Sequence, residues 1–456
     1  MKTRHIAEFT ALSLMSFVIV AVAGCRGIPT RSERSAKANV ATVRAASMIE
    51  RAQLPKLTAE SRLEDFVLFA MLNRPTVAAT YQDWVASVER ITVERSLPDP
   101  RLTFSTDIQK MLMGVMPGLM VDLPGPGKLR AAAAVASAES ETRYFDFEAA
   151  VLKSAFEVKR AYYQLYFLER RIAVNHDTLL LLRDVEKLAR TQNEVGKATL
   201  QDVLRAQIEA ERLETEIANL EDSRTALLAE FKASLGLTAS EPAPPVPKQF
   251  ASTELQVPLD ELWSVAVKRN PRLQRMAAEV RAAEAFITVA RRSRVPDFSA
   301  GIEADVKANP VFFTPSLGVT LPIWRDKIAA QIAAAQAGKR GAEARLTAEE
   351  IDLAVEFAGR SFMLRESTRN VSLLSERLLP KARQSLEVAR SSYAAGKTGY
   401  LDLTDAQRTL LEFQLAEIEA RTQRELALAE LSLLIGGIAP PGAPLLAPAT
   451  NQGTQP

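Results

Sequence analysis

The feature that most limits how this chain can fold is an internal repeat. Residues 196–207 (GKATLQDVLRAQ) share their pattern with residues 396–407 (GKTGYLDLTDAQ), 200 positions later. In both copies a glycine interrupts a long helical pattern, and a second helical pattern begins a few residues further on. Glycine allows the left-handed backbone in which helices commonly end. We therefore predict that Gly196 and Gly396 lie at the tips of two equivalent helical hairpins.

The duplication divides most of the chain into two structural repeats. We place the first repeat at residues 58–240 and the second at residues 258–436. The segment between them, 241–257, begins with a Pro-rich stretch and is predicted to be a linker. Residues 437–456, rich in Pro and Ala, are predicted to form a disordered tail.

Long helices dominate both repeats. Residues 128–195 contain neither Gly nor Pro, which predicts one helix roughly 100 Å long. The helix that returns from each tip carries apolar residues at a 3,4 spacing, as in a coiled-coil seam, interrupted only by Arg224 and Arg424. The seam positions are Val203, Ala206, Ala210, Leu213, Ile217, Leu220, Leu227 and Phe231, then Leu403, Ala406, Leu410, Phe413, Ala420, Ala427 and Leu431. We predict long helical hairpins at 128–236 and 325–435.

Two shorter stretches change to a period of two. In 101–123 and 298–321 apolar and polar residues alternate, which predicts a hairpin of two strands, each with one apolar face, in either stretch. Four such strands cannot close a barrel, and lipid does not tolerate open sheet edges. Several copies of the chain would have to share one barrel, with apolar side chains facing lipid and polar ones facing a water-filled lumen. A soluble sandwich with one solvated face is the alternative interpretation.

The N-terminus has the pattern of an export signal. A basic start precedes an apolar run shorter than the ~20 residues that a membrane-spanning helix needs, so we predict a signal peptide at 1–24. The run ends in VAGC, which resembles the lipobox of bacterial lipoproteins, and Cys25 is the only cysteine. The resemblance implies lipid on Cys25, with residues 25–57 as a tether, and Arg26 is not the aspartate of inner-membrane retention. A chance buried cysteine after an ordinary signal peptide is the alternative.

Composition excludes several functional classes. The formal net charge is +2 with both signs mixed along the chain, which gives no basic face for nucleic acid. The only histidine outside the signal peptide is His176, so no nucleophile–base pair or zinc spacing exists, and we expect neither an enzyme nor a metal site. The only covalent group expected is the lipid on Cys25.

A methionine cluster at the first strand turn has two interpretations. Thioethers are ligands for Cu(I), but flexible apolar side chains that fill an exposed hairpin explain the cluster better. We favour the second interpretation. The cluster consists of Met111, Met113, Met116 and Met120.

These features together resemble the TolC-like outer-membrane efflux protein family, over about residues 60–436. The resemblance implies a mainly α fold with a small β portion, and a homotrimer whose strands form one twelve-stranded barrel in the outer membrane of a Gram-negative bacterium. Its helices would continue as an α-helical tunnel across the periplasm. The implied function is the exit duct of a tripartite efflux pump or type I secretion system. Such a duct passively conducts substrates from a periplasmic adaptor and an inner-membrane transporter of RND, ABC or MFS type.

The resemblance also assigns roles at the hairpin tips. Exposed tips are the part of the chain that a periplasmic partner can reach, and the pairs Gly196-Lys197 and Gly396-Lys397 are implied to dock the adaptor. Turn chemistry alone would also place a glycine there.

A gate is predicted next to the tips. Asp402 and Asp405, at i and i+3, lie on one helix face, and the resemblance implies that three chains bring them together as a cation-attracting ring. We predict that Tyr393, Asp202 and Arg205 hold the second-repeat helices inward by polar links. The alternative is that acids in a first turn complement the helix dipole, worth ~0.3–1 kcal/mol each.

Other points stay open on sequence grounds. A structural, periplasm-spanning coiled-coil lipoprotein without channel activity would explain the helices but not the strands, and a pump adaptor would need only one hairpin. The junction at 124–128 (PGPGK) resembles the heavy-metal branch of the family more than the drug branch, yet the exported substrate is not defined. The first repeat also departs from the family, because Arg74 separates Asn73 from Pro75.

Overall fold

A computed structural model describes residues 29–52, 56–109, 112–246, 250, 259–305 and 310–436. The predicted signal peptide, Cys25 and the predicted tail lie outside the described residues. Contacts divide the chain into two compact units. Unit 1 is drawn from residues 1–44, 81–146 and 274–348, and unit 2 from residues 45–80, 147–273 and 349–456. Each unit therefore combines segments of both sequence repeats.

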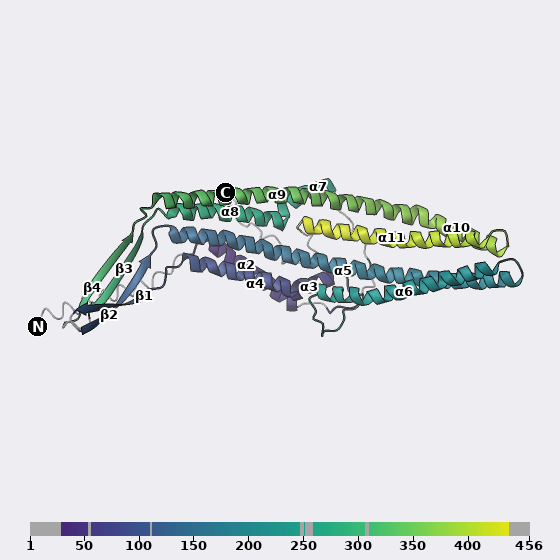
Figure 1. Cartoon of the computed structure of the whole chain (residues 1–456), viewed down its shortest axis with the longest axis horizontal. Helices are drawn as coiled ribbons and strands as arrows, with labels where there is room; N and C mark the ends of the chain where they lie inside the picture. The colour runs from purple at the N-terminus through teal and green to yellow at the C-terminus, as the bar shows by residue number, and fades with distance from the viewer. Residues whose placement is uncertain are drawn as a thin grey trace. The chain divides into compact units, whose positions relative to one another are not determined.

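The same order of elements occurs twice (Figure 1). The first set is α3 (Leu63–Asn73), α4 (Pro75–Arg95), β1 (Arg101–Gln109), β2 (Leu112–Leu123), α5 (Lys128–Glu194) and α6 (Leu200–Ser234). The second set is α7 (Leu259–Arg269), α8 (Pro271–Arg292), β3 (Asp297–Asp305), β4 (Phe312–Thr320), α9 (Arg325–Ser372), η1 (Leu373–Leu378), α10 (Leu379–Ala394) and α11 (Tyr400–Leu434). The predicted mainly α chain, with duplicated helical hairpins and four strands, is confirmed. No helix in the described ranges is long and apolar enough to cross a membrane.

The four strands form one antiparallel sheet in unit 1, in the order β1-β2-β3-β4. The central pairing joins the repeats, with Leu119 of β2 opposite Ile302 of β3. Apolar side chains on the strands, such as Phe104 and Leu317, are exposed, whereas the Ser105 hydroxyl donates to Glu303 at 3.2 Å on the polar side. The sheet therefore has the two chemically different faces that the alternation predicts.

The segment interpreted as a tether contains a helix, α2 (Arg31–Ala52). The sequence shows no periodic apolar pattern that predicts this helix, because a single buried contact fixes its start. Glu33 is 1% exposed and accepts hydrogen bonds from Arg95 Nε at 2.7 Å and Thr92 Oγ1 at 2.9 Å. Burial alone would raise the pKa of Glu33, but these bonds and the Arg95 and Lys37 charges lower it. Helix α2 is thereby tied to α4 in unit 1.

Asn270, in the Asn-Pro break of the second repeat, caps one helix and holds the end of another. In unit 2 the Asn270 Oδ1 accepts from the backbone of Arg272 at 2.8 Å, which caps α8. Its Nδ2 donates to the Leu434 carbonyl at 2.9 Å, which holds the end of α11. The next turn requires Gly436, with φ +76°, because a Cβ there would lie 2.8 Å from the Arg269 carbonyl.

In the first repeat Arg74 occupies the position of Asn270, and the structure explains this departure. The Arg74 guanidinium forms an ion pair with Glu157 of α5. Gly236, with φ +78°, takes the place of Gly436, and a Cβ on it would lie 2.8 Å from the Arg74 Cα. The first junction is therefore held by the Arg74–Glu157 ion pair, whereas the second is held by the Asn270 side-chain amide.

The predicted coiled-coil seams are confirmed. All predicted positions of α6 are buried except the partly buried Leu227, and those of α11 are buried except Leu410 and Phe413, which are partly buried. Arg224 bridges to Glu169 of α5, with its Nε 2.6 Å from the carboxylate, and Arg424 pairs with buried Glu425 at 2.5 Å.

The two long helices leading to the tips differ. Helix α5 runs unbroken for 67 residues, whereas the second-repeat helix contains the π-helical turn η1 just before Pro380. The Leu379 N–H bonds the Leu374 carbonyl, one residue further back than in an α-helix. Proline lacks an N–H and displaces the preceding turn, so a π-turn accommodates it here.

Candidate functional site

Both hairpin tips use the same backbone geometry. At the end of α5 the Gly196 N–H bonds the Asn193 carbonyl at 3.0 Å, and the Lys197 N–H bonds the Gln192 carbonyl at 2.7 Å. This pair of bonds is a Schellman motif, and it needs the positive φ of +75° at Gly196. Gly396, with φ +71°, ends α10 in the same way. The glycines and the lysines that follow them are exposed, as predicted for tips.

The two aspartates at equivalent positions, Asp202 and Asp402, act as helix caps. Asp202 Oδ2 accepts from the Thr199 N–H at 3.0 Å and from the Thr199 hydroxyl at 2.8 Å. Asp402 Oδ2 accepts from the Gly399 N–H at 3.3 Å. The alternative interpretation, that acids here stabilise a helix start, therefore describes a contact that each makes. Asp405 is exposed and Arg205 is partly exposed, and neither has an ion pair within the described part of the chain.

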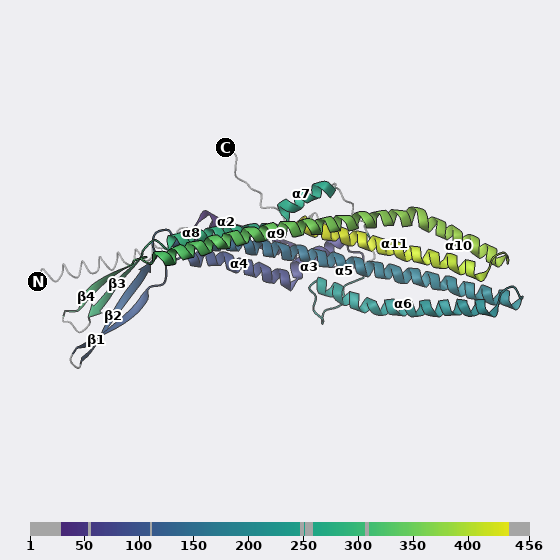
Figure 2. The same ribbon diagram turned by 45° about the horizontal axis from the view of Figure 1, so that its top comes forward.

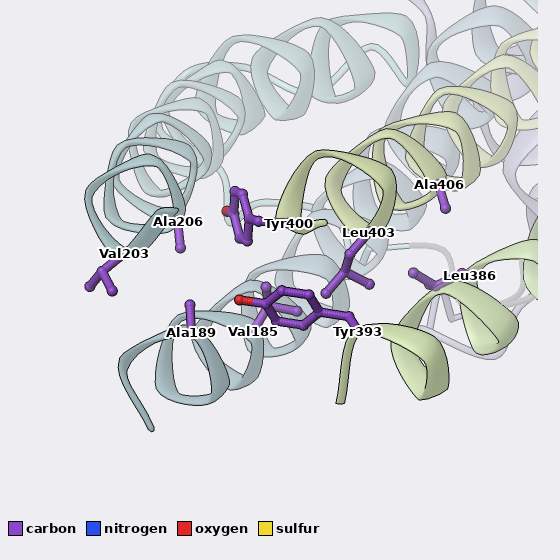
Figure 3. Close-up of a cluster of buried hydrophobic side chains, with 9 residues drawn as sticks. All are labelled: Val185, Ala189, Val203, Ala206, Leu386, Tyr393, Tyr400, Leu403 and Ala406. Carbon is purple, nitrogen blue, oxygen red and sulfur yellow. The ribbon is translucent and has the colours of Figure 1, made fainter. Parts of the chain in front are cut away.

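Two tyrosines are buried behind the tips. Tyr393 of α10 and Tyr400 of α11 are 5% and 4% exposed, and their ring centroids lie 6.1 Å apart. In Figure 3 both rings point toward small side chains, Tyr400 toward Ala206 of α6 and Tyr393 toward Ala189 of α5. The cluster they form, here called the tip cluster, draws on both hairpins of unit 2. Its members are Val185, Ala189, Val203, Ala206, Leu386, Tyr393, Tyr400, Leu403 and Ala406.

Burial raises the pKa of both phenols. It raises the pKa of Tyr400 to about 12, with a smaller contribution from the Glu209 carboxylate. Burial and the nearby Asp202 charge raise the pKa of Tyr393. Both hydroxyls are neutral near pH 7, as an ordinary phenol already is, and neither has a hydrogen-bond partner among the described residues. Of the predicted gate residues, the structure brings Tyr393 near Asp202 without joining them by a hydrogen bond.

Sequence reasoning missed an ion pair at this site. Arg408 of α11 pairs with Glu209 of α6, which links the two hairpins. The signal was the difference between the repeats, since Tyr400 and Arg408 stand where the first repeat has Leu200 and Ile208. In the second repeat, the residues on this helix face make contacts within the chain.

The equivalent face of the first repeat is uncovered. Leu200, Leu204 and Ile208 follow one another at one-turn spacing on α6 and are 64%, 50% and 61% exposed. A stripe of large apolar side chains on one helix face indicates a contact surface. Here it is called the α6 stripe.

His176 and the methionine cluster do not form a candidate site. His176 is about half exposed, with Nε2 3.6 Å from a Glu221 carboxylate oxygen, so it is a surface residue. Within the described ranges, no group of three His, Cys, Asp or Glu is placed to hold a metal. Met111 of the methionine cluster lies outside the described residues, and Met116 and Met120 are partly buried.

A duplicated chain of long helical hairpins, whose four amphipathic strands gather in one sheet, is organised like a channel rather than an enzyme. The model of the outer membrane efflux protein family matches residues 69–237 and 262–437, about three-quarters of the chain. The chain belongs to this family. Its members are channels of the Gram-negative outer membrane, which excludes an enzyme and gives the chain its location.

Similar solved structures agree on the fold. The chain is similar to CusC, with a TM-score of 0.73 and 16% identity, over 83% of this chain and 92% of CusC. It is also similar to the outer membrane protein VceC of Vibrio cholerae, with a TM-score of 0.71 and 18% identity, over 83% of this chain and 97% of VceC.

One relative is closer in sequence. The cobalt-zinc-cadmium resistance protein CzcC of Cupriavidus metallidurans is 27% identical over 258 residues. The match covers 53% of this chain and 57% of CzcC, so the chain spans somewhat more than half the length of this relative.

Proposed function

We propose that this protein is the outer-membrane exit duct of a tripartite export system, through which substrates pass passively from a periplasmic adaptor and an inner-membrane transporter. The observation that carries the proposal is the sheet. It has one exposed apolar face, and its outer strands β1 and β4 each have a single strand neighbour in the described chain. Such edges in lipid require neighbouring strands. Three copies would supply twelve strands to one closed barrel.

The α6 stripe supports assembly from several copies. Because the repeats are equivalent, the face of α11 that packs on the first hairpin has a counterpart on α6. We propose that the α6 stripe packs on the second-repeat hairpin of a neighbouring copy. A closed ring in which the two hairpins alternate would then bury both faces.

The tips are the proposed periplasmic end. Gly196-Lys197 and Gly396-Lys397 would meet the adaptor, and Asp402 and Asp405 of all copies would surround the entrance as a cation-attracting ring. The near approach of Tyr393 and Asp202 supports their assignment to the contact that closes the entrance. Arg205 belongs to this proposal as the cation facing a neighbouring carboxylate.

The proposed anchor is lipid on Cys25. Three acyl chains on one cysteine would hold the chain firmly to the membrane, whereas a single chain binds only marginally. Mass spectrometry of the mature N-terminus tests this, because an unmodified Cys25 or a different terminus contradicts it.

For cargo we propose divalent transition-metal cations. The support is the similarity to CzcC, a cobalt-zinc-cadmium resistance protein, together with the PGPGK junction at 124–128. Deletion of the gene should sensitise its host to these cations but not to hydrophobic drugs. The opposite pattern of sensitivity would reassign the cargo and leave the duct intact.

The duct itself is tested by combining planar-bilayer conductance with the oligomer mass of the purified protein. A conducting trimer is the expected result. A species that never conducts would favour the alternative, a structural coiled-coil lipoprotein.

A further inference from the structure

A pocket of about 340 Å³ lies in unit 2 between the two hairpins. Helices α5, α6 and α11 line it, so it is formed by both repeats of one chain. Figure 2 shows α11 beside the α5–α6 hairpin in this part of the chain. The volume is at the lower end of the range for small-molecule sites.

Two buried amide side chains with unsatisfied polar atoms line this pocket. Asn175 of α5 is 1% exposed and Gln407 of α11 is 4% exposed. The Asn175 Oδ1 and both polar atoms of the Gln407 side chain have no hydrogen bond among the described residues. Buried polar groups are nearly always paired, so an unpaired pair in one pocket is unusual. Three unsatisfied polar atoms are the pattern expected of a site whose ligand supplies the missing bonds.

The equivalent residue of the first repeat shows the contrast. Gln207 occupies the same repeat position as Gln407, but its Nε2 donates to Glu186 at 2.9 Å, and it does not line the pocket. The unsatisfied amide is therefore specific to the second repeat.

The pocket offers more acceptors than donors. The hydroxyl of Thr178 donates to the Val174 carbonyl at 2.9 Å, and that of Thr404 to the Leu401 carbonyl at 3.0 Å. Both hydroxyl protons are thus used within their own helices, and only oxygen lone pairs face a ligand. Of the three unsatisfied amide atoms two are acceptors and one, Gln407 Nε2, is a donor, so a ligand with N–H donors supplies two of the three missing bonds.

Charge at the rim is balanced. Three carboxylates, Glu209, Glu216 and Glu412, and two guanidiniums, Arg212 and Arg408, line the pocket. Arg171 beside Glu216 brings the formal charge to zero. Arg408 is already paired with Glu209.

The unpaired rim charges are one of each sign. Glu216 lies 3.9 Å from Arg171, while Glu412 and Arg212 have no ion pair among the described residues. Leucines, among them Leu182 and Leu213, provide an apolar wall.

We propose that this pocket binds a small organic ammonium ion that carries N–H donors. The ammonium head bonds Asn175 Oδ1 and Gln407 Oε1, the alkyl body lies on the leucine wall, and Glu412 at the rim complements a second ammonium in a longer ligand. Because α11 forms one side of the pocket and α5–α6 the other, an occupied pocket strengthens the contact between the hairpins. The binding itself does not depend on the proposed duct function.

Calorimetric titration of the full-length protein in detergent with cadaverine tests the proposal. Its permethylated analogue pentamethonium has the same two charges without N–H donors. All titrations use the Asp402→Asn, Asp405→Asn background, so that carboxylates at the tip do not contribute. We expect saturable binding of cadaverine and at least tenfold weaker binding of pentamethonium.

Three variants separate the site from general charge effects. Gln407→Leu should weaken cadaverine binding at least tenfold, whereas the matched control Gln207→Leu should leave it within twofold. Gln407→Glu adds a carboxylate at the same place and should tighten binding, a gain that misfolding cannot produce. Absence of saturable binding, equal affinity of Gln407→Leu and the parent, or no gain in Gln407→Glu would overturn the proposal.

Discussion

At the residue scale, Asn270 makes contacts that no neighbouring side chain duplicates. It caps α8 and bonds the last turn of α11. Asn270→Ala removes both contacts and leaves a buried carbonyl unpaired, so the free energy of unfolding should fall by about 1–3 kcal/mol. Denaturant unfolding in detergent measures this change. Asn73→Ala, at the exposed asparagine just before Arg74 in the first-repeat junction, should change it by less than about 0.5 kcal/mol, and equal losses would contradict the assigned role.

Glu33 gives a second prediction at this scale. Its pKa in the folded chain is below the usual 4.5, so its contribution is fully present above pH 4.5 and is lost as pH falls through the folded-state pKa. Glu33→Gln should destabilise the protein at pH 7 by about 1–3 kcal/mol and progressively less below pH 4.5. Thermal unfolding of the parent and the variant, at pH 7 and below pH 4.5, checks this. A constant difference between them at every pH would exclude Glu33 as the titrating group.

At the scale of single elements, α6 and α11 are equivalent helices with different surfaces. Tyr400 and Arg408 of α11 are used within the chain, while the α6 stripe is exposed. Leu204→Lys places a charge in this stripe and removes apolar burial worth about 1.5–3 kcal/mol per contact. The proposed trimer should dissociate at a higher protein concentration than that of the parent, measured by mass photometry, with the chain still helical by circular dichroism. Gln201→Lys, at an exposed polar position in the same turn, should assemble like the parent. Unchanged assembly of Leu204→Lys would remove the stripe from the interface.

At the scale of the whole molecule, the prediction concerns the closed entrance. Replacing Arg205 and Tyr393 together should raise single-channel conductance, because the predicted inward contacts of the second hairpin are lost. Asp402→Ala with Asp405→Ala should reduce cation preference and block by multivalent cations. Because Asp402 also caps α11, Asp405→Ala alone serves as the control that leaves the cap intact. If both double variants conduct and select like the parent, the constriction lies elsewhere.

The sequence by itself determined the repeats, the element types and the tips. These follow from local rules, since a glycine with positive φ, a 3,4 apolar spacing or an alternating strand needs only near neighbours to be recognised. The seam residues of α6 and α11 illustrate this, because their burial follows from helix periodicity alone. The sequence also offered a dipole role for the first-turn acids Asp402 and Asp405, as the alternative to a gate, but it predicted neither the cap made by Asp202 nor the one made by Asp402.

Only the tertiary structure decided which surfaces meet. The sheet order that pairs β2 with β3 joins residues 175 to 185 positions apart, and helix α2 is held by Glu33 and Arg95, 62 positions apart. Neither contact leaves a periodic signal, because one buried pair depends on where two distant helices lie. The same holds for Asn175 and Gln407, ordinary helix residues in the sequence. Their unsatisfied amides become a site only because α5 and α11 enclose one pocket, where buried polar groups no longer have water as a partner.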